Sequence, residues 1–223
     1  MTKKKIALFD LDHTLIPFDS DYEWNEFTIK LGWRDADIFR QANQAYFAQY
    51  RDGTLNIHDY VRFATQAILD KGATESIAAH TRFMAATVLK GIQKPALDLV
   101  QGHQKAGDMV VIVTATNEFV TRPIAAAFGV QELIAIDLVR NAQGEFTGDI
   151  LGTPSFREGK VTRVEAWLAA RNLGWQDVET TFYSDSMNDL SLLEKANHPV
   201  ATNPDERLRQ LATERGWRIL DLF

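Results

Sequence analysis

Two aspartates two positions apart directly follow the first apolar segment of the chain. Ile6 to Phe9 is apolar, and the sequence continues Asp10-Leu11-Asp12. Side chains alternate along a strand, so carboxylates at i and i+2 point the same way at its end. Crowding like charges is costly unless a cation or a shared proton offsets them. Asp10 and Asp12 are therefore candidates for a metal or acid–base site, against the simpler alternative of two exposed loop acids.

A second apolar segment, Met109 to Val113, leads directly into the hydroxyl residue Thr114 and the small residue Ala115. Thr114 could cap a following helix with its side-chain oxygen. Alternatively, its hydroxyl and the nearby backbone N–H groups could hold an anion at the helix N-terminus. Both interpretations place Thr114 at the start of a helix.

Two further positions carry charged residues of interest. Lys160 stands at the start of an amphipathic segment, where a lone lysine is normally just solvated. Another apolar segment ends at Tyr183 and is followed by Asp185, with a second acid, Asp189, four residues on. Asp185 would add a third carboxylate beside the first two aspartates. Clustered hard oxygen ligands suit Mg²⁺, which usually keeps several waters and joins a phosphate.

Buried strands must position these residues. Short apolar segments that are partly β-branched predict such strands, and they occur at residues 6–9, 109–113, 133–136 and 180–183, with weaker candidates at 199–201 and 218–220. Helical stretches separate them, which is typical of right-handed crossovers and a mainly parallel sheet. Loops that leave the carboxyl ends of such strands build the binding crevice. The sequence therefore predicts an α/β fold, and the residues just after each apolar segment are the ones expected at this crevice.

The stretch from about residue 20 to 89 interrupts this alternation. It has helical patterning rich in aromatic residues, with Gly32, Gly53 and Gly72 as plausible breaks between helices. We interpret most of these aromatics as a helical core. The chain is accordingly divided into a Rossmann-like catalytic core, residues 1–16 and 91–223, and a helical cap domain, residues 17–90. Residues 141–147 resemble a hairpin turn between short strands.

Composition excludes several classes of function. The chain has 223 residues, 24 lysines and arginines against 30 acids, and no cysteine, which removes disulfides, thiolate zinc sites and cysteine nucleophiles. An acidic chain without a long basic stripe is a poor candidate for binding nucleic acid. The lysines at 3–5 precede an apolar run that Asp10 ends too soon for a signal peptide or a membrane span. We expect a cytoplasmic protein with neither nucleic acid nor membrane as a partner.

In this order, the four sites resemble the motifs of the haloacid dehalogenase-like superfamily of phosphohydrolases. The matching residues are Asp10-Leu11-Asp12-His13-Thr14-Leu15, then Thr114, then Lys160, then Asp185-Ser186-Met187-Asn188-Asp189. The resemblance covers essentially the whole chain. The helical insert is similar to the cap, of the C1 type, found in the phosphoserine phosphatase branch. The resemblance implies a Mg²⁺-dependent phosphatase that acts on a small phosphomonoester.

The resemblance also implies a role for each matching residue. Asp10 would be the nucleophile that forms an aspartyl-phosphate, and it would also bind Mg²⁺ together with Asp185. Asp12 would be the general acid and base, and its main-chain carbonyl would touch the metal. Asp189 would hold Lys160 or a metal-bound water in position without contacting the substrate itself. The phosphoryl oxygens would be held by Thr114, Ala115, Lys160 and Asn188.

The chain departs from the family pattern at positions around these residues. His13 stands where glycine or serine is more usual, and Ser184 replaces the glycine before the fourth-motif acid. Ala115 and Thr116 replace a common pair of glycines. None of these changes removes a catalytic group, but they leave the substrate open. The five histidines show no metal-ligand spacing and are interpreted as surface or packing residues, with His13 nearest to the chemistry.

The cap favours an amino alcohol phosphate as the substrate. Phosphoserine phosphatases bind the substrate amine with a cap glutamate and its carboxylate with a cap arginine. Asp19 takes the first position here, with Asp21 and Glu23 close by. Alignment through Gly53 places an alanine at the arginine position, and Arg62 is two residues early, about 200° away on a helix. These acids predict a substrate such as histidinol phosphate, against the alternative that they are a solvated helix start.

Three other functions compete with this prediction. The first is phosphoserine phosphatase activity, which requires Arg62 to reach the substrate. The second is a signalling receiver domain, which also uses Mg²⁺ and an aspartyl-phosphate but would carry its acceptor aspartate where this chain has Thr114. The third is an inactive phosphate-binding module, which would lack Asp10 or Asp12. Within the superfamily, Asp12 favours a phosphatase or phosphomutase over dehalogenases and ion-pumping ATPases.

Overall fold

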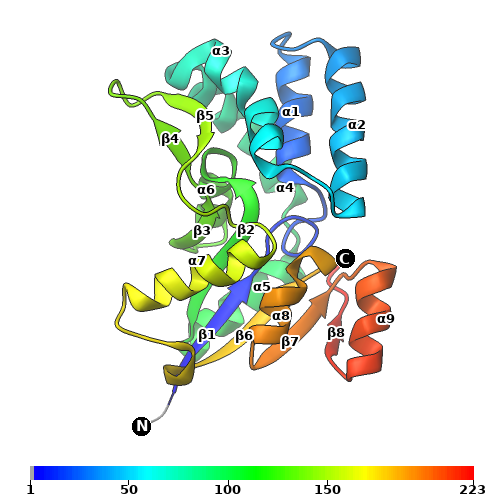
Figure 1. The fold of residues 1–223 in the computed structure, drawn as a ribbon, viewed down its shortest axis with the longest axis vertical. Coiled ribbons are helices and arrows are strands. Elements are labelled where there is room, and N and C mark those ends of the chain that lie inside the picture. The colour runs from blue at the N-terminus through cyan, green and yellow to red at the C-terminus, as the bar shows by residue number, and fades with distance from the viewer. Residues whose placement is uncertain (1–2) are drawn as a thin grey trace.

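A six-stranded parallel sheet forms the centre of the molecule (Figure 1). The computed structural model describes residues 3–223. The strand order is β3-β2-β1-β6-β7-β8, and every neighbouring pair runs parallel. The strands are β1 (Lys4–Phe9), β2 (Met109–Asn117), β3 (Glu132–Ile136), β6 (Val178–Ser184), β7 (His198–Thr202) and β8 (Arg218–Leu220). The predicted α/β fold is confirmed.

Helices cover both faces of the sheet, which is why its strands read as continuous apolar runs. Ala7 and Phe9 of β1 pack with α5 (Lys94–Ala106) and α6 (Glu118–Ala127). Ile6 and Leu8 point to the other face and pack with α7 (Glu158–Ala169), α8 (Leu190–Lys195) and α9 (Glu206–Arg215). Two short 3₁₀ turns, Trp175–Asp177 and Met187–Asp189, precede β6 and α8. Both faces of β1 are thus buried from Ile6 to Asp10.

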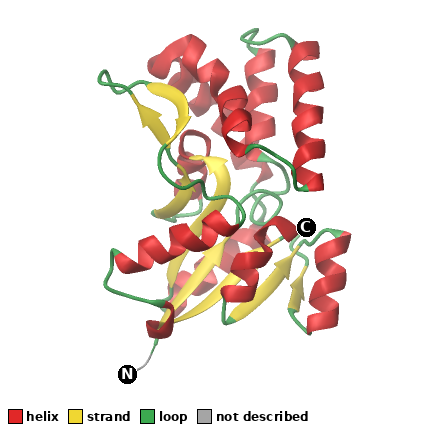
Figure 2. Ribbon diagram, viewed as in Figure 1, coloured by secondary structure: helices red, strands yellow, loops and turns green. Residues whose placement is uncertain are grey.

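Most of the segment between β1 and α5 is a helical insert that stands at one end of the molecule (Figure 2). It consists of α1 (Ser20–Lys30), α2 (Ala36–Asp52), α3 (Ile57–Phe83), a π-helical turn (Met84–Val88) and α4 (Leu89–Gly91). Asp19, Asp35 and Asn56 cap the first three helices, each accepting a backbone N–H of the first turn. Gly53 ends α2 with φ 77°, and Gly72 breaks the helical geometry inside α3 with φ 76° and ψ 168°. None of the helices formed by residues 3–223 is long and apolar enough to cross a membrane.

An antiparallel hairpin, which follows β3 in the core, contacts the insert. Its strands are β4 (Leu138–Arg140) and β5 (Phe146–Ile150), in the region where the sequence predicted a hairpin turn. β5 lies against α3 (Figure 1). A Cβ at Gly148 would come within 3.0 Å of the Leu69 side chain, so glycine permits this close packing. The insert is therefore held to the core both along the chain and through the hairpin.

Aromatic side chains fill the contact between the insert and α6. Trp24, Phe83 and Phe119 surround His80, with ring centroids 5.2–5.4 Å from the imidazole. His80 is 4% exposed, and its Nε2 lies 3.1 Å from the carbonyl oxygen of Val120. Burial lowers the pKa of His80 to about 4, because the apolar surroundings disfavour the charged imidazole. His80 therefore folds into the structure as a neutral side chain.

This buried histidine predicts a loss of stability in mild acid. The folded-state pKa of about 4 lies below the ordinary 6.5, so as the pH falls from 6.5 towards 4 only the unfolded chain takes up the proton. By pH 5 this difference costs up to about 2 kcal/mol of unfolding free energy. His80→Gln keeps an N–H for Val120 but cannot titrate. Urea unfolding at pH 7.5 and pH 5 should show a smaller acid loss for the variant, by about that amount.

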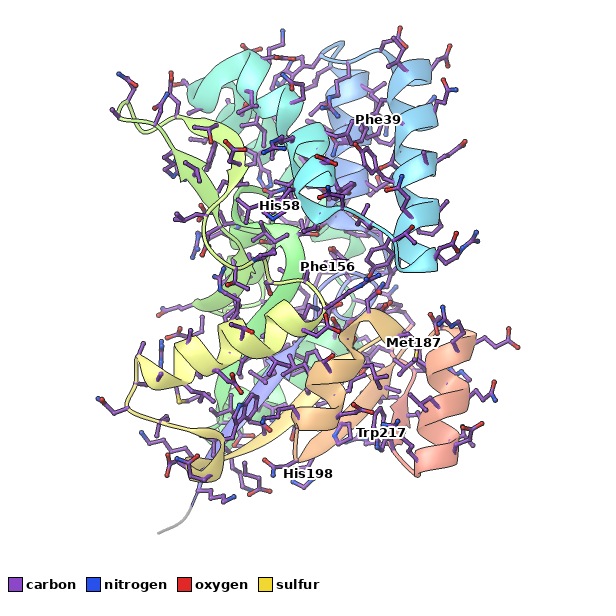
Figure 3. All side chains as sticks on the ribbon, in the orientation of Figure 1. Phe39, His58, Phe156, Met187, His198 and Trp217 are labelled. Atoms are coloured by element: carbon purple, nitrogen blue, oxygen red, sulfur yellow. The ribbon has the colours of Figure 1, made fainter. Side chains whose placement is uncertain are left out.

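His58, exposed on the same helix (Figure 3), supplies the matched control. His58→Gln should retain the acid sensitivity of the wild-type protein. If His80→Gln and the wild type lost equal stability between the two pH values, the neutral buried state of His80 would be wrong.

Candidate active site

A cavity of about 1260 Å³ lies between the carboxyl ends of the strands and the helical insert. Figure 3 shows Phe156 and Met187, two residues of its lining, where the insert faces the core. The core contributes to the lining nearly all the residues that the sequence singled out, namely Asp10, Asp12, Thr114, Ala115, Lys160, Asp185, Asn188 and Asp189. Residues up to 179 positions apart in the chain thus meet at one cavity, as the parallel sheet requires.

Lys160 is the central buried charge of this cavity. It lies at the start of α7 with 2% of its surface exposed. Its Nζ donates hydrogen bonds of 2.8 Å to Asp10 Oδ1 and 2.7 Å to Asp189 Oδ2. Burial by itself would lower the pKa of Lys160, but the charges of Asp10 and Asp189 outweigh it and raise that pKa above its usual range. Lys160 is therefore a permanent cation that fixes one oxygen of each carboxylate.

Asp10 and Asp185 lie on either side of the Thr14 hydroxyl. Thr14 Oγ1 is 3.0 Å from Asp185 Oδ1 and 3.4 Å from Asp10 Oδ2, and it accepts the backbone N–H of Asp185 at 3.1 Å. Burial, and then the charge of Asp10, raise the pKa of Asp185 well above its ordinary value. Two carboxylates are thus crowded in a site that favours added positive charge.

The chemistry of this donor set fits a hard divalent cation. Within residues 3–223, no three acidic or histidine side chains converge in the manner of a metal site. The carboxyl of Asp12 binds Ser20 and Thr116, so Asp10 and Asp185 are the carboxylates of the set that remain for a cation. Oxygen ligands with positions left for water and phosphate are what Mg²⁺ prefers.

The Asp12 carboxyl is held by one donor from the insert and one from the core. Its Oδ1 accepts the backbone N–H of Ser20 at 2.8 Å, and its Oδ2 accepts the hydroxyl of Thr116 at 2.8 Å. Burial raises the pKa of Asp12 well above the ordinary value, with the charge of Asp19 adding to the effect. Asp12 is thus a fixed carboxyl whose protonated form is favoured, which suits a group that gives and takes a proton.

The position predicted for Thr114 needs a correction. β2 runs on to Asn117, which pairs with Ile136 of β3, and it is Asn117 that caps α6 by accepting the N–H of Val120. Thr114 therefore lies inside a strand extension and not at a helix N-terminus. Its Oγ1 accepts the backbone N–H of Thr116 at 3.1 Å, which leaves the hydroxyl proton available to the cavity.

Asp189 and Asn188 occupy the turn that follows β6. Asp189 accepts the Ser184 hydroxyl at 2.8 Å in addition to Lys160, so the serine that replaces a common glycine is part of the buried network. Burial raises the pKa of Asp189 to about 6, although the charge of Lys160 opposes the shift. Asn188 lines the cavity, and its Oδ1 accepts Nε of Arg157 at 3.3 Å. Arg157 also reaches the carbonyl oxygen of Gly53 at 2.8 Å and so links the core to the insert.

The insert contributes acidic and aromatic side chains to the cavity. Asp19 and Glu23 line it, as predicted, and Asp19 at the same time caps α1 by accepting the N–H of Tyr22. Most aromatics of the insert are interpreted from the sequence as a core, and several of the others line the cavity, namely Tyr22, Tyr46, Phe47, Tyr50 and Tyr60. Tyr46, Phe47 and Tyr50 lie on α2, and their spacing of three and four positions along one helix face is the signal that could have found them.

Two of the candidate substrate residues, Arg62 and Asp21, do not line the cavity. Arg62 lies outside the cavity lining and points to the hairpin, where it donates to Asp149 at 2.9 Å, as expected from its rotation on the helix. Asp21 is 3% exposed and lies behind the cavity wall. It accepts the Tyr60 hydroxyl at 2.7 Å, and burial, followed by the charge of Asp19, raises its pKa to about 7. Asp21 thus braces the insert and does not contact the cavity.

The sequence model of the haloacid dehalogenase-like hydrolase family matches residues 7–194 of this chain. The chain belongs to this family. The prediction of a phosphatase of this family is confirmed, and the receiver-domain alternative falls with it. The four charged or hydroxyl motifs predicted from the sequence all lie within the matched residues.

Relatives of known sequence or structure extend along the whole chain. A histidinol-phosphatase of Neisseria meningitidis is 40% identical over 219 residues, which cover 98% of this chain and 99% of that protein. A crystal structure of a Bordetella pertussis protein of unknown function has a TM-score of 0.93 and 46% identity, with 100% of both chains covered. A substrate-bound phosphoserine phosphatase has a TM-score of 0.66 at 18% identity, covering 99% of this chain and 94% of that one, and shows the shared fold.

The approach of α7 to the preceding loop generates a prediction for this family member. A Cβ at Gly159, next to Lys160, would overlap the carbonyl oxygen of Pro154. Gly159→Ala should therefore displace the start of α7, lower the unfolding free energy by about 1–3 kcal/mol and reduce hydrolysis of any substrate. Gly102→Ala on the exposed face of α5 meets nothing within 4 Å and should stabilise the protein by about 1 kcal/mol. Equal urea midpoints for the two variants would contradict this account of α7.

Proposed function

We propose that this protein is a Mg²⁺-dependent phosphatase that hydrolyses a small phosphomonoester through an aspartyl-phosphate at Asp10. The observation that carries the proposal is the arrangement around Asp10. A buried lysine is bonded to one of its oxygens, and a second carboxylate, Asp185, lies across Thr14. An anionic nucleophile can approach an anionic phosphate only where positive charge is supplied.

Asp10, Asp185 and the main-chain carbonyl of Asp12 would hold the Mg²⁺, which when bound neutralises phosphoryl charge. Lys160, the Thr114 hydroxyl, the backbone of Ala115 and Asn188 would bind and orient the phosphoryl oxygens. Asp189 keeps Lys160 in place through their 2.7 Å bond. These residues surround one cavity and leave its insert side to the rest of the substrate.

Asp10 attacks phosphorus with a carboxylate oxygen, and the ester bond breaks as Asp12 gives its proton to the leaving alcohol. Asp12, now a carboxylate, takes a proton from water, and the resulting hydroxide attacks the acyl phosphate to release phosphate and regenerate Asp10. A single group can serve both steps because the first step leaves it deprotonated for the second. The raised pKa of Asp12 supports the first of these roles.

We infer that the substrate is histidinol phosphate or a similar amino alcohol phosphate. Three features support this substrate: the 40% identity to a histidinol-phosphatase, the carboxylates of Asp19 and Glu23 in the lining, and the aromatic wall of the insert. An ammonium group would bind the acids, and a flat ring would lie against the aromatics. Arg62 does not reach the cavity, although exposed Arg51 and Arg207 line it and could serve a carboxylate.

The proposed nucleophile is tested by Asp10→Asn. The amide cannot attack phosphorus and binds Mg²⁺ poorly, so turnover should fall by more than about a thousandfold while the fold is retained. Phosphate release measures turnover, and calorimetric titration measures Mg²⁺ binding. Asp98→Asn, an exposed acid on α5 paired with Lys94, is the matched control and should change neither. A tenth of the wild-type activity in repurified Asp10→Asn would disprove the nucleophile.

The proposed substrate is tested by comparing histidinol phosphate with O-phosphoserine. We expect kcat/KM for histidinol phosphate to be at least about tenfold higher, because the acidic lining attracts the ammonium and repels a carboxylate. Asp19→Asn removes the charge and keeps a good helix cap. It should lower kcat/KM for histidinol phosphate by about tenfold and spare 4-nitrophenyl phosphate, which has no amine. A tenfold preference for O-phosphoserine would mean that Arg51 or Arg207 binds a carboxylate and that the proposed substrate is wrong.

A further inference from the structure

We propose that Thr116 is a positioning residue that fixes the Asp12 carboxyl for proton transfer to the leaving group. The inference rests on the proposed phosphatase function and names a residue for which the family pattern offers no role, since glycine is common there. Thr116 lines the cavity on the same side as Asp12, and its Oγ1 lies 2.8 Å from Asp12 Oδ2.

The two oxygens of Asp12 have donors of different kinds. Oδ1 accepts the backbone N–H of Ser20, which can only donate, so a proton on that oxygen would compete with a fixed donor. Oδ2 faces the Thr116 hydroxyl, which can donate to a carboxylate or rotate and accept from a carboxylic acid. The geometry therefore assigns the transferable proton to Oδ2. As the ester bond breaks, that proton turns from the Thr116 oxygen to the alcohol oxygen and is transferred to it, and the Thr116 hydroxyl rotates to donate to the new carboxylate.

The backbone around Thr116 is itself held in place. Its N–H donates to the Thr114 hydroxyl oxygen at 3.1 Å, and the next residue, Asn117, pairs with β3 after a register shift. The strand extension that moved Thr114 away from a helix start thus brings the Thr116 hydroxyl to Asp12. Ser20, the other donor, is the first residue of α1. Asp12 is therefore held between the carboxyl end of β2 and the first residue of α1.

The test is Thr116→Val, which keeps the β-branched shape and removes the hydroxyl. Pre-steady-state bursts should show slower phosphorylation of the enzyme by an alkyl phosphate, by about 10- to 100-fold, because a hydrogen bond to a charged group is lost. Phosphorylation by 4-nitrophenyl phosphate should slow much less, because 4-nitrophenolate leaves without a proton. Thr116→Ser, which restores the hydroxyl, should recover most of the alkyl phosphate rate.

Thr202→Val is the matched control, because Thr202 is buried at the end of β7 and its hydroxyl bonds to the carbonyl of Val200 in its own strand. It should leave both burst rates unchanged. A merely structural role for Thr116 would slow both substrates equally, or would not be rescued by serine, and either result would overturn the proposal. If the wild-type enzyme showed no burst and no phosphate release with any ester, the proposed function itself would fail, which separates the two outcomes.

Discussion

The buried ion pairs of Lys160 are the interaction on which the site depends. A lysine that is 2% exposed would be unstable as a cation without partners, and two buried aspartates would be unstable as anions without it. Together they form a triad in which Asp10 and Asp189 each receive one bond from the same nitrogen. Removing any one member would leave uncompensated charge in the interior. The positions of β1, β6 and α7 are thus joined at a single ammonium group.

The residues around Lys160 keep its ammonium group and the two paired carboxylates in place. α7 starts close to the loop that precedes it, at a glycine that tolerates the Pro154 carbonyl, and Lys160 follows at once. Ser184 fills the place of a glycine with a hydroxyl that binds Asp189. Thr14 separates Asp10 from Asp185 and keeps their carboxylates at hydrogen-bonding distance from one oxygen. Negative charge still exceeds positive charge in this part of the cavity, which is the electrostatic reason for proposing a cation there.

The core of the fold was predictable from the sequence because its strands are short apolar runs that end in polar residues. Every predicted strand is present, and Asp10 and Asp185 could be placed together because parallel strands bring their carboxyl ends to one edge. Lys160 starts a helix, and only the resemblance to the family's motifs placed it beside them. The extension of β2 past Thr114 was not predictable, since Ala115 is a weak strand former and the pairing of Asn117 with β3, after a register shift, is a tertiary contact.

The insert was harder to predict, because helical periodicity shows which residues share a face but not what that face meets. On α2, three aromatics line the cavity, whereas Phe39 is buried in the core against Phe63. Asp19, Asp21 and Glu23 look alike in the sequence, yet one caps a helix at the cavity, one is buried behind it and one lines it. Only the packing of α1 against α3 and α6 distinguishes them.

Arg157 has a consequence for how this enzyme can change during evolution. Its backbone has φ 51°, unusual for a residue other than glycine, and its guanidinium contacts both Gly53 of the insert and Asn188 of the core. A change in the length or course of the loop after α2 would therefore move Arg157 and, through it, Asn188 at the end of the cavity that is proposed to bind phosphate. Arg157 therefore connects the part of the insert that would select the substrate to the part of the core that would bind phosphate. Drift in the insert that alters recognition must be matched by compensating changes in the core.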